Sequence, residues 1–353
     1  MEDEVLPAAP FDTSSATCSG NGGGVLAVAW EPKAGDKLAA ASTDGSVHLF
    51  DGSGDSLGRL VDRKDHGFAS CLGWAPDAAR LAVGCQDGTV LVFSNGEILT
   101  RAAGHMNQVR CVSWCPSGRD CIASGSLDGT LRIWEPSKGK CLVTCQGEGG
   151  YVYCILWKTD GSAIAAGSTD GIARIFNPST GACMVLCESH EGPVTSLAWG
   201  PGDANLASGS HDGQALVWNA KTGLKVSSCS TSSRVYSIAW RADSHRPRLA
   251  TASHDGAVGI FDASLGICMA KCQGHAGAVF VVTWSQTSSE RSWLASAGQD
   301  GSIRIWEANT GQCLAVHVGH ANCIVSLQWS PSGNRLASGS EDGLAKIWPV
   351  TDS

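Results

Sequence analysis

The stretch that decides the fold reads ASGSEDGLAKIW and spans residues 337–348. Its central Asp342-Gly343 pair separates two short runs of small and apolar residues, and Asp-Gly favours the positive backbone angles of a tight hairpin turn. Such a pair recurs at near-constant intervals of 41 to 45 residues, beginning at Asp44, Asp87, Asp128, Asp170, Asp212, Asp255, Asp300 and Asp342. A period of this length indicates one supersecondary unit that is repeated in space.

Two aromatic residues keep a nearly fixed distance from each of these pairs. Six positions after the Asp, the chain has Phe50, Phe93, Trp134, Phe176, Trp218, Phe261, Trp306 and Trp348. Another Trp precedes each Asp by 13 to 16 positions, at Trp30, Trp74, Trp114, Trp157, Trp199, Trp240, Trp284 and Trp329. In residues 108–145, strand-like segments (QVRCVSW, CIASGS, LRIW, CLVTC) alternate with turn-forming residues. Each unit is therefore predicted to be a sheet of four antiparallel strands.

A single sheet of this kind is hydrophobic on both faces and cannot stay folded alone. Radial stacking buries both faces against neighbouring sheets and leaves only short edges. The sequence therefore predicts an all-β fold, a single eight-bladed β-propeller over residues 1–353, with its repeats between about 21 and 350. The eighth unit stops after its third strand, so we expect residues 4–12 (EVLPAAPFD) to close the ring as the fourth strand of the last blade.

Composition restricts the class of partner. A net charge of -8 argues against direct nucleic-acid binding, which normally requires a basic face. No apolar run reaches the roughly 18 residues of a membrane span, and the start MEDEVLPAAPF has no targeting pattern, so we expect no membrane insertion and a cytoplasmic or nuclear location. The 16 cysteines include pairs four residues apart, such as Cys141 and Cys145, which lie roughly 13 Å apart on a strand and cannot share one zinc ion. We expect them to be small core residues, with no cofactor or metal.

These motifs resemble the WD-repeat family of β-propellers over nearly the whole chain. The resemblance implies a brace in each blade: a His before the first strand, a Ser or Thr four residues before the turn Asp, the Asp, and the Trp six beyond. Complete sets are His105–Ser124–Asp128–Trp134, His190–Ser208–Asp212–Trp218, His275–Ser296–Asp300–Trp306 and His320–Ser338–Asp342–Trp348. The other four blades have Asn21, Asp65, Glu148 and Thr231 at the His position and Phe in place of Trp, although His66 is a candidate substitute one place later.

A Ser, a His and an Asp together also suggest a hydrolase. Here the trio occurs in four copies, each tied to a Trp expected in the core, and no copy carries an oxyanion-hole signature. We interpret the trios as structural braces and expect no enzymatic activity and no small-molecule substrate.

The resemblance also implies a binding site. In family members that bind peptides at the channel mouth, contacts come from the residues six and four before the first-strand Trp and from the residue before the turn Asp. The candidate set at these positions is Phe68, Arg110, Tyr151, Tyr153, Arg234, Tyr236, Phe280, His211, His254 and Glu341. It contains all three tyrosines of the chain, and aromatic residues and Arg are enriched at binding hot spots. The arginines suit an acidic or phosphorylated segment, but the same side chains can also simply plug the mouth.

The expected function is a non-catalytic scaffold that binds a peptide or protein, within a larger complex. One alternative is a chromatin or corepressor-type peptide reader, because transducin-β-like corepressor subunits resemble this chain in having eight repeats. Another is a ubiquitin-ligase substrate receptor, which is disfavoured because the Arg that such receptors carry three places after the third-strand aromatic is absent from all eight units. Trp293 lies outside the repeat pattern and is expected in a loop on the opposite face, where a second contact surface remains open.

Overall fold

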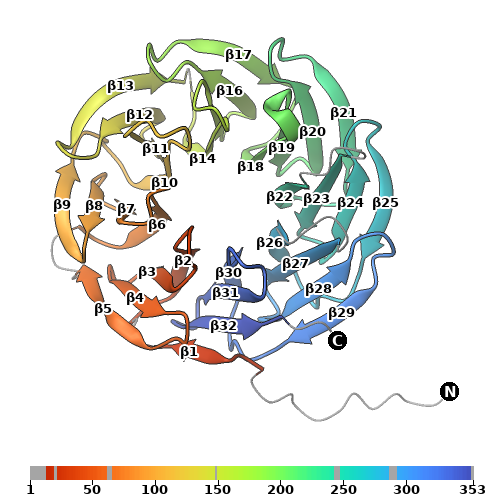
Figure 1. Ribbon diagram of the computed structural model, residues 1–353. Helices are drawn as coiled ribbons and strands as arrows, with labels where there is room; N and C mark the ends of the chain where they lie inside the picture. Colours follow the sequence, from red (N-terminus) through yellow and green to blue (C-terminus); the bar gives the residue numbers. More distant parts are fainter. Residues whose placement is uncertain are drawn as a thin grey trace.

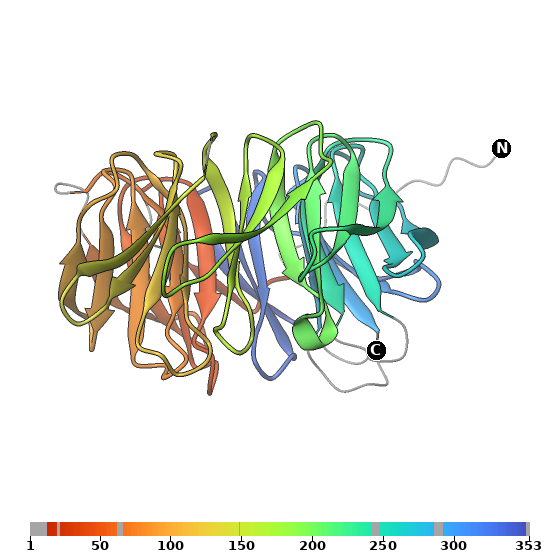
Figure 2. The ribbon, with the colours of Figure 1, turned by 90° about the horizontal axis from the view of Figure 1, so that it is seen from above.

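The computed structural model describes residues 13–19, 22–61, 66–147, 149–241, 247–285 and 292–350. Eight four-stranded antiparallel sheets are arranged around a central axis (Figure 1). Seen from its side, the molecule is a disc through whose thickness the inner strands run (Figure 2). This arrangement confirms the all-β, eight-bladed propeller that the repeat predicts. No helix within the described residues is long and apolar enough to cross a bilayer.

The strands follow one another in each blade from the axis outward. Blades 1 to 4 consist of β2 (Val25–Trp30), β3 (Lys37–Ser42), β4 (Val47–Asp51) and β5 (Ser56–Val61); β6 (Ala69–Trp74), β7 (Arg80–Cys85), β8 (Val90–Ser94) and β9 (Glu97–Ala102); β10 (Val109–Trp114), β11 (Ile122–Ser126), β12 (Thr130–Glu135) and β13 (Lys140–Gln146); and β14 (Val152–Trp157), β15 (Ile164–Ser168), β16 (Ile172–Phe176) and β17 (Cys183–Glu188). Blades 5 to 8 consist of β18 (Val194–Trp199), β19 (Asn205–Ser210), β20 (Gln214–Asn219) and β21 (Lys225–Ser230); β22 (Val235–Arg241), β23 (Arg248–Ser253), β24 (Val258–Asp262) and β25 (Ile267–Cys272); β26 (Val279–Trp284), β27 (Trp293–Gly298), β28 (Ile303–Glu307) and β29 (Cys313–His317); and β30 (Ile324–Trp329), β31 (Arg335–Ser340), β32 (Ala345–Pro349) and β1 (Ala16–Cys18). One short 3-10 helix, η1 (Pro201–Asp203), connects β18 to β19.

The core lies between adjacent blades, where third-strand aromatics meet small second-strand residues. Trp134 and Trp218 are fully buried. Gly125 of β11 shows why the second strand is rich in small residues: a Cβ atom there would lie 2.5 Å from Val152 of the next blade. The blades therefore approach closely enough to exclude water, which places most of the stabilising apolar burial between sheets.

Inner-strand tryptophans also link the blades by hydrogen bonds, a role that spacing alone does not reveal. The indole Nε1 donates to an inner-strand carbonyl of the preceding blade from Trp74 to Ala29, Trp114 to Gly73, Trp157 to Ser113, Trp199 to Leu156, Trp284 to Ala239 and Trp329 to Thr283, at 2.9 to 3.2 Å. The corresponding Nε1 atoms of Trp30 and Trp240 have no partner among the described residues. Within the described residues, six of the eight junctions between adjacent blades thus have an indole hydrogen bond.

An N-terminal strand closes the ring, as the incomplete eighth unit predicts. β1 pairs antiparallel with β32, with Ala16 opposite Ile347 and Cys18 opposite Ala345. Cys18 is fully buried against the first and last blades. The segment expected to form this strand, residues 4–12, lies outside the described residues; the strand itself is the later segment Ala16–Cys18.

Two further expectations need correction. Trp293 is not in a loop but begins β27, because its carbonyl accepts the Ser285 N–H at 3.0 Å and its backbone pairs with Glu307. The repeated cysteines are core residues at Cys145, but Cys183 and Cys268 are exposed because they stand near the start of the outermost strand, which has no further strand outside it.

Candidate functional site at the channel mouth

The antiparallel pairing within each blade brings the candidate binding residues to one face of the disc. In blade 3, Val109 at the start of the inner strand lies opposite Ser126 at the end of the second strand. The first residues of every inner strand therefore lie beside the Asp-Gly turn that follows the second strand. We call this side of the disc the turn face, and we call the three candidate contact residues of each blade its mouth positions.

A hydrogen bond of the same kind fixes the mouth positions in all eight blades. The N–H of the residue before the turn Asp donates to the carbonyl of the residue immediately before the inner strand. The donor and acceptor pairs are Thr43 and Gly24, Gln86 and Phe68, Leu127 and Gln108, Thr169 and Tyr151, His211 and Pro193, His254 and Arg234, Gln299 and Ala278, and Glu341 and Cys323, at 2.8 to 3.1 Å. The backbone of this surface is thus set before any ligand arrives.

Four rings from three blades form one continuous cluster around Tyr236, which we call the Tyr236 cluster. Its ring centroid lies 5.4 Å from that of His211, 5.9 Å from His254 and 5.3 Å from Phe280. All three contacts are edge-to-face, the geometry that aromatic quadrupoles favour. Tyr236 stands at a β-bulge of β22, because Val235 pairs with Ser253 and Ser237 with Ala252, and a bulge of this kind re-aims the side chain of the extra residue.

Polar contacts orient this cluster. The Tyr236 hydroxyl lies 3.0 Å from His254 Nδ1 and donates to it when the imidazole is neutral and protonated at Nε2. Partial burial and the nearby positive charge of Arg234 lower the pKa of His211, so this ring is neutral at pH 7. The cluster therefore presents apolar ring surface with an adjacent cation.

A second group joins blades 3 and 4. The guanidinium carbon of Arg110 lies 5.3 Å from the ring centroid of Tyr153, which is a cation–π contact. Tyr151, two residues earlier, is 52% exposed, and its backbone N–H donates to Thr169 Oγ1 at 2.8 Å. A pocket of about 300 Å³ opens beside Tyr151 and is lined by Leu127, the Asp128-Gly129 turn and the glycines of the β13–β14 loop.

The remaining candidates stand apart from both groups. Phe68 is half-buried in blade 2 and Glu341 is exposed in blade 8, and across the described ranges no ring contact or ion pair joins either one to Tyr236 or Tyr153. The sequence therefore identifies more candidate residues than the structure brings together.

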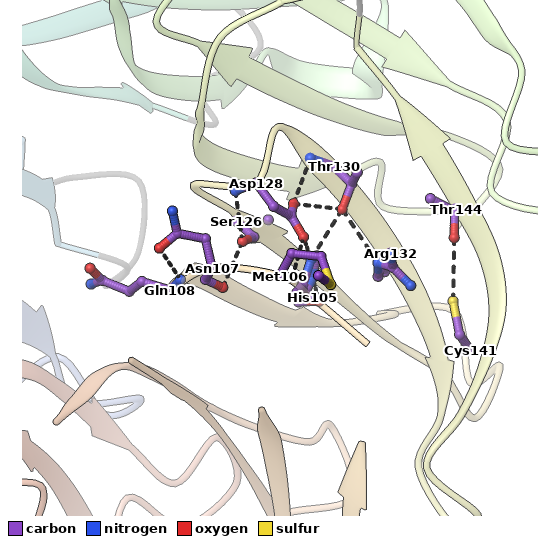
Figure 3. Close-up of polar contacts among 12 residues, drawn as sticks. His105, Met106, Asn107, Gln108, Ser126, Asp128, Thr130, Arg132, Cys141 and Thr144 are labelled. Atoms are coloured by element: carbon purple, nitrogen blue, oxygen red, sulfur yellow. Dashed lines mark hydrogen bonds and ion pairs between the residues drawn. The ribbon is translucent and has the colours of Figure 1, made fainter. Parts of the chain in front are cut away.

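The four complete braces adopt the geometry that the resemblance implies. Figure 3 shows His105, Asp128 and Thr130 of blade 3, where His105 Nδ1 lies 2.9 Å from Asp128 Oδ2. His105 Nε2 and Trp134 Nε1 are each 2.7 Å from Ser124 Oγ. An indole N–H can only donate, so Ser124 Oγ accepts from Trp134. The ionised Asp128 can only accept, so neutral His105 carries its proton on Nδ1 and donates it to Asp128. Nε2 of His105 is then an acceptor, and the Ser124 hydroxyl donates to it.

The other three braces repeat these contacts. His–Asp and His–Ser distances are 2.8 and 2.8 Å for His190, 2.9 and 2.8 Å for His275, and 2.7 and 2.8 Å for His320, and each Trp Nε1 lies 2.7 Å from its Ser Oγ. Burial lowers the pKa of His105 and His190, although the Asp partner opposes the shift. Burial alone would raise the pKa of Asp128, but hydrogen bonds from Thr130 and Met106 outweigh it and lower that pKa to about 2.

This geometry suits a brace better than a nucleophile. Ser124 is fully buried and its Oγ is engaged by both Trp134 and His105. A substrate would have to open the blade to reach it. No group of three or more potential metal ligands gathers in the part of the chain that the structure describes.

Blades without a complete brace use substitutes that sequence reasoning mostly missed. His66 does take the His role toward Asp87, at 2.8 Å. In blade 4, the nearly buried Arg174 pairs with Asp170 at 2.7 Å. In blade 6 the hydroxyl of Thr251 remains at the Ser position, fully buried and without a partner among the described residues. Arg174 lies four residues after the turn Asp, and this spacing was the signal in the sequence that could have predicted the Arg174–Asp170 pair.

Comparison with known proteins places this geometry in a family. The model described as "WD domain, G-beta repeat" matches residues 223–262, 266–307 and 311–349, and the model described as "Anaphase-promoting complex subunit 4 WD40 domain" matches residues 28–115 and 112–201. Among curated proteins, a WD repeat-containing protein 26 homolog of Arabidopsis thaliana is 34% identical over 92 residues, 24% of this chain and 15% of that protein. Protein HIRA of Zea mays is 31% identical over 128 residues, 30% of this chain and 13% of that protein. This chain thus matches only a small part of these longer relatives.

Solved structures share the fold across nearly the whole chain. Sqt1 of Chaetomium thermophilum, in a crystal structure bound to the N-terminus of the ribosomal protein L10, matches with a TM-score of 0.87 and 20% identity over 96% of this chain and 100% of that chain. The computationally designed Ika8 protein matches with a TM-score of 0.80 and 24% identity, again over 96% of this chain and 100% of that chain. At these identities the likeness concerns the fold alone.

Proposed function

The chain belongs to the WD-repeat family, and from that premise we propose that it is a non-catalytic scaffold that binds a short protein segment at the channel mouth. Proteins of this family generally mediate protein interactions. The finer assignment, a mouth site built on the Tyr236 cluster and the Arg110–Tyr153 pair, is ours. We further propose that the partner is part of a larger complex and that the chain works in the cytoplasm or nucleus.

The observation that carries the proposal is the Tyr236 cluster. Its rings come from blades 5, 6 and 7, and the backbone hydrogen bonds of the turn face hold their bases in place. A rigid aromatic surface loses little conformational entropy when a ligand binds, which is why such surfaces dominate interface energetics. If these side chains only plugged the mouth, His254 of this cluster and Tyr151 of the second group would not need to be exposed to solvent, as they are.

The comparison with Sqt1 supports the kind of partner. That protein shares the propeller architecture and is bound to the N-terminus of the ribosomal protein L10. A propeller of this architecture is therefore able to hold a short terminal segment of another protein, and we infer the same kind of occupant, though not the same partner, for this chain.

Selection from a library of random 12-residue peptides displayed on phage tests the proposal with a defined probe. Peptides recovered on the wild type should bind Tyr236→Ala at least tenfold more weakly, because the substitution removes three ring contacts. Leu224→Ala is the matched control, since it removes a 69% exposed apolar side chain on the outer wall. If the peptides bind both variants like the wild type, the mouth is not the binding site.

A further inference from the structure

The mouth positions of two blades carry positive charge, although the molecule as a whole is acidic. The mouth positions of blades 3 to 7 include Arg110 and Arg234 but no Asp or Glu, whereas the whole chain has a net charge of -8. Both arginines are exposed. Within these five blades the charged side chains at the mouth positions are therefore all basic, which favours a partner of opposite sign.

These two arginines also differ from others in how they are used. Arg80 pairs with Asp77 and Asp120 at 2.7 and 2.6 Å, and Arg174 pairs with Asp170. Among the residues that the structure describes, neither mouth arginine has a carboxylate within ion-pair distance. Their hydrogen-bonding capacity toward an anion is therefore available.

We infer that the segment bound at the mouth carries carboxylate side chains, which Arg110 of blade 3 and Arg234 of blade 6 receive, with an apolar residue on the Tyr236 cluster. This inference rests on the proposed function. β10 and β22, which carry or adjoin these arginines, are inner strands of blades 3 and 6 and lie on different sides of the axis in Figure 1. Arg110 and Arg234 thus mark two sides of the surface, and the segment crosses it.

The arrangement favours carboxylates over a phosphate. A doubly charged phosphate is usually held by a cluster of arginines, whereas each mouth arginine stands alone in its blade. The Arg110 guanidinium lies over the Tyr153 ring, and a guanidinium in a cation–π contact can still bind a planar carboxylate bidentately through its N–H groups. One carboxylate per arginine matches this geometry.

The peptides selected on the wild type provide the test. The recovered sequences should be enriched in Asp and Glu relative to the unselected library. For the most enriched peptide, measured by fluorescence anisotropy, Arg110→Gln and Arg234→Gln should each weaken binding about tenfold, the usual loss for one charge-assisted hydrogen bond. Lys221→Gln, which removes an exposed charge in the β20–β21 turn, is the matched control and should change binding less than twofold.

Replacing the peptide's Asp and Glu by Asn and Gln should weaken its binding to the wild type at least as much as the arginine substitutions do. A peptide with phosphoserine at the same places should bind no more tightly than the original peptide with its carboxylates. Peptides without acidic enrichment that lose binding to Tyr236→Ala but not to the arginine variants would overturn this inference while leaving the proposed function intact. Tighter binding of the phosphoserine peptide, or of a 12-residue oligothymidine, would also overturn it. If Tyr236→Ala, Arg110→Gln and Arg234→Gln all bind the peptides like the wild type, both proposals are wrong.

Discussion

Replacing Ser124 by Ala isolates the energy of one brace. The Ser124 side chain is fully buried, and its Oγ is the only hydrogen-bond partner that the described structure gives to the indole N–H of Trp134 and to His105 Nε2. Trp134 is itself fully buried, so water cannot replace the lost partner. Ser124→Ala therefore leaves two buried polar groups unsatisfied.

The magnitude follows from that count. Each buried group without a partner costs about 1–3 kcal/mol, so Ser124→Ala should lower the free energy of unfolding by roughly 2–6 kcal/mol. Adding Trp134→Phe to Ser124→Ala removes the indole N–H, which is one of the two buried groups left without a partner. The double variant should therefore lose about 1–2 kcal/mol less than the sum of the single variants. Blade 4 already contains this combination, with Ala166 and Phe176 at the same positions.

Urea unfolding followed by circular dichroism at pH 7.5 measures these differences. Ser137→Ala, at an exposed position in the β12–β13 turn, is the control and should stay within about 0.5 kcal/mol of the wild type. The reasoning fails if Ser124→Ala matches that control, or if the single losses add up to the loss of the double variant.

Three further changes probe other parts of the structure. Thr251→Val should leave stability unchanged or raise it by up to about 1 kcal/mol, because the Thr251 hydroxyl is buried without a described partner; a loss above 1 kcal/mol in the same urea assay contradicts this. Lowering the pH from 7 to 5 should lower the melting temperature. The pKa values of His105 and His190 lie below those of the unfolded chain, near 6.5, so the unfolded chain binds more protons there and each His costs up to about 1.4 kcal/mol per pH unit. A melting temperature that does not change between pH 7 and pH 5 refutes the assignment of neutral buried imidazoles. Deleting residues 1–18 removes β1 and exposes Ile347 and Ala345, so the melting temperature should fall by about 5 °C or more; an unchanged transition in calorimetry would mean that closure does not couple the blades.

Repetition made the fold readable from the sequence. The Asp-Gly turns and the aromatic positions around them fix strand boundaries, whereas the β-bulge at Tyr236 is visible only in the strand pairing. The His–Ser–Asp–Trp braces were also predictable from the resemblance to the WD-repeat family, because all members of a brace lie in one blade. The closing strand was predicted at residues 4–12, but the described strand is Ala16–Cys18, since nothing local distinguishes which N-terminal segment reaches the edge of β32.

What the sequence alone determined is the repeat pattern: the number of blades, the order of strands and the residues offered at the turn face. Tertiary structure decided what happens between repeats. Tyr236 meets His211 and Phe280, which lie 25 and 44 residues away in neighbouring blades, whereas Phe68 and Glu341 occupy equivalent positions and meet neither group. Contacts across blades depend on side-chain length and on the angle between sheets, and neither is encoded in the spacing of residues along the chain.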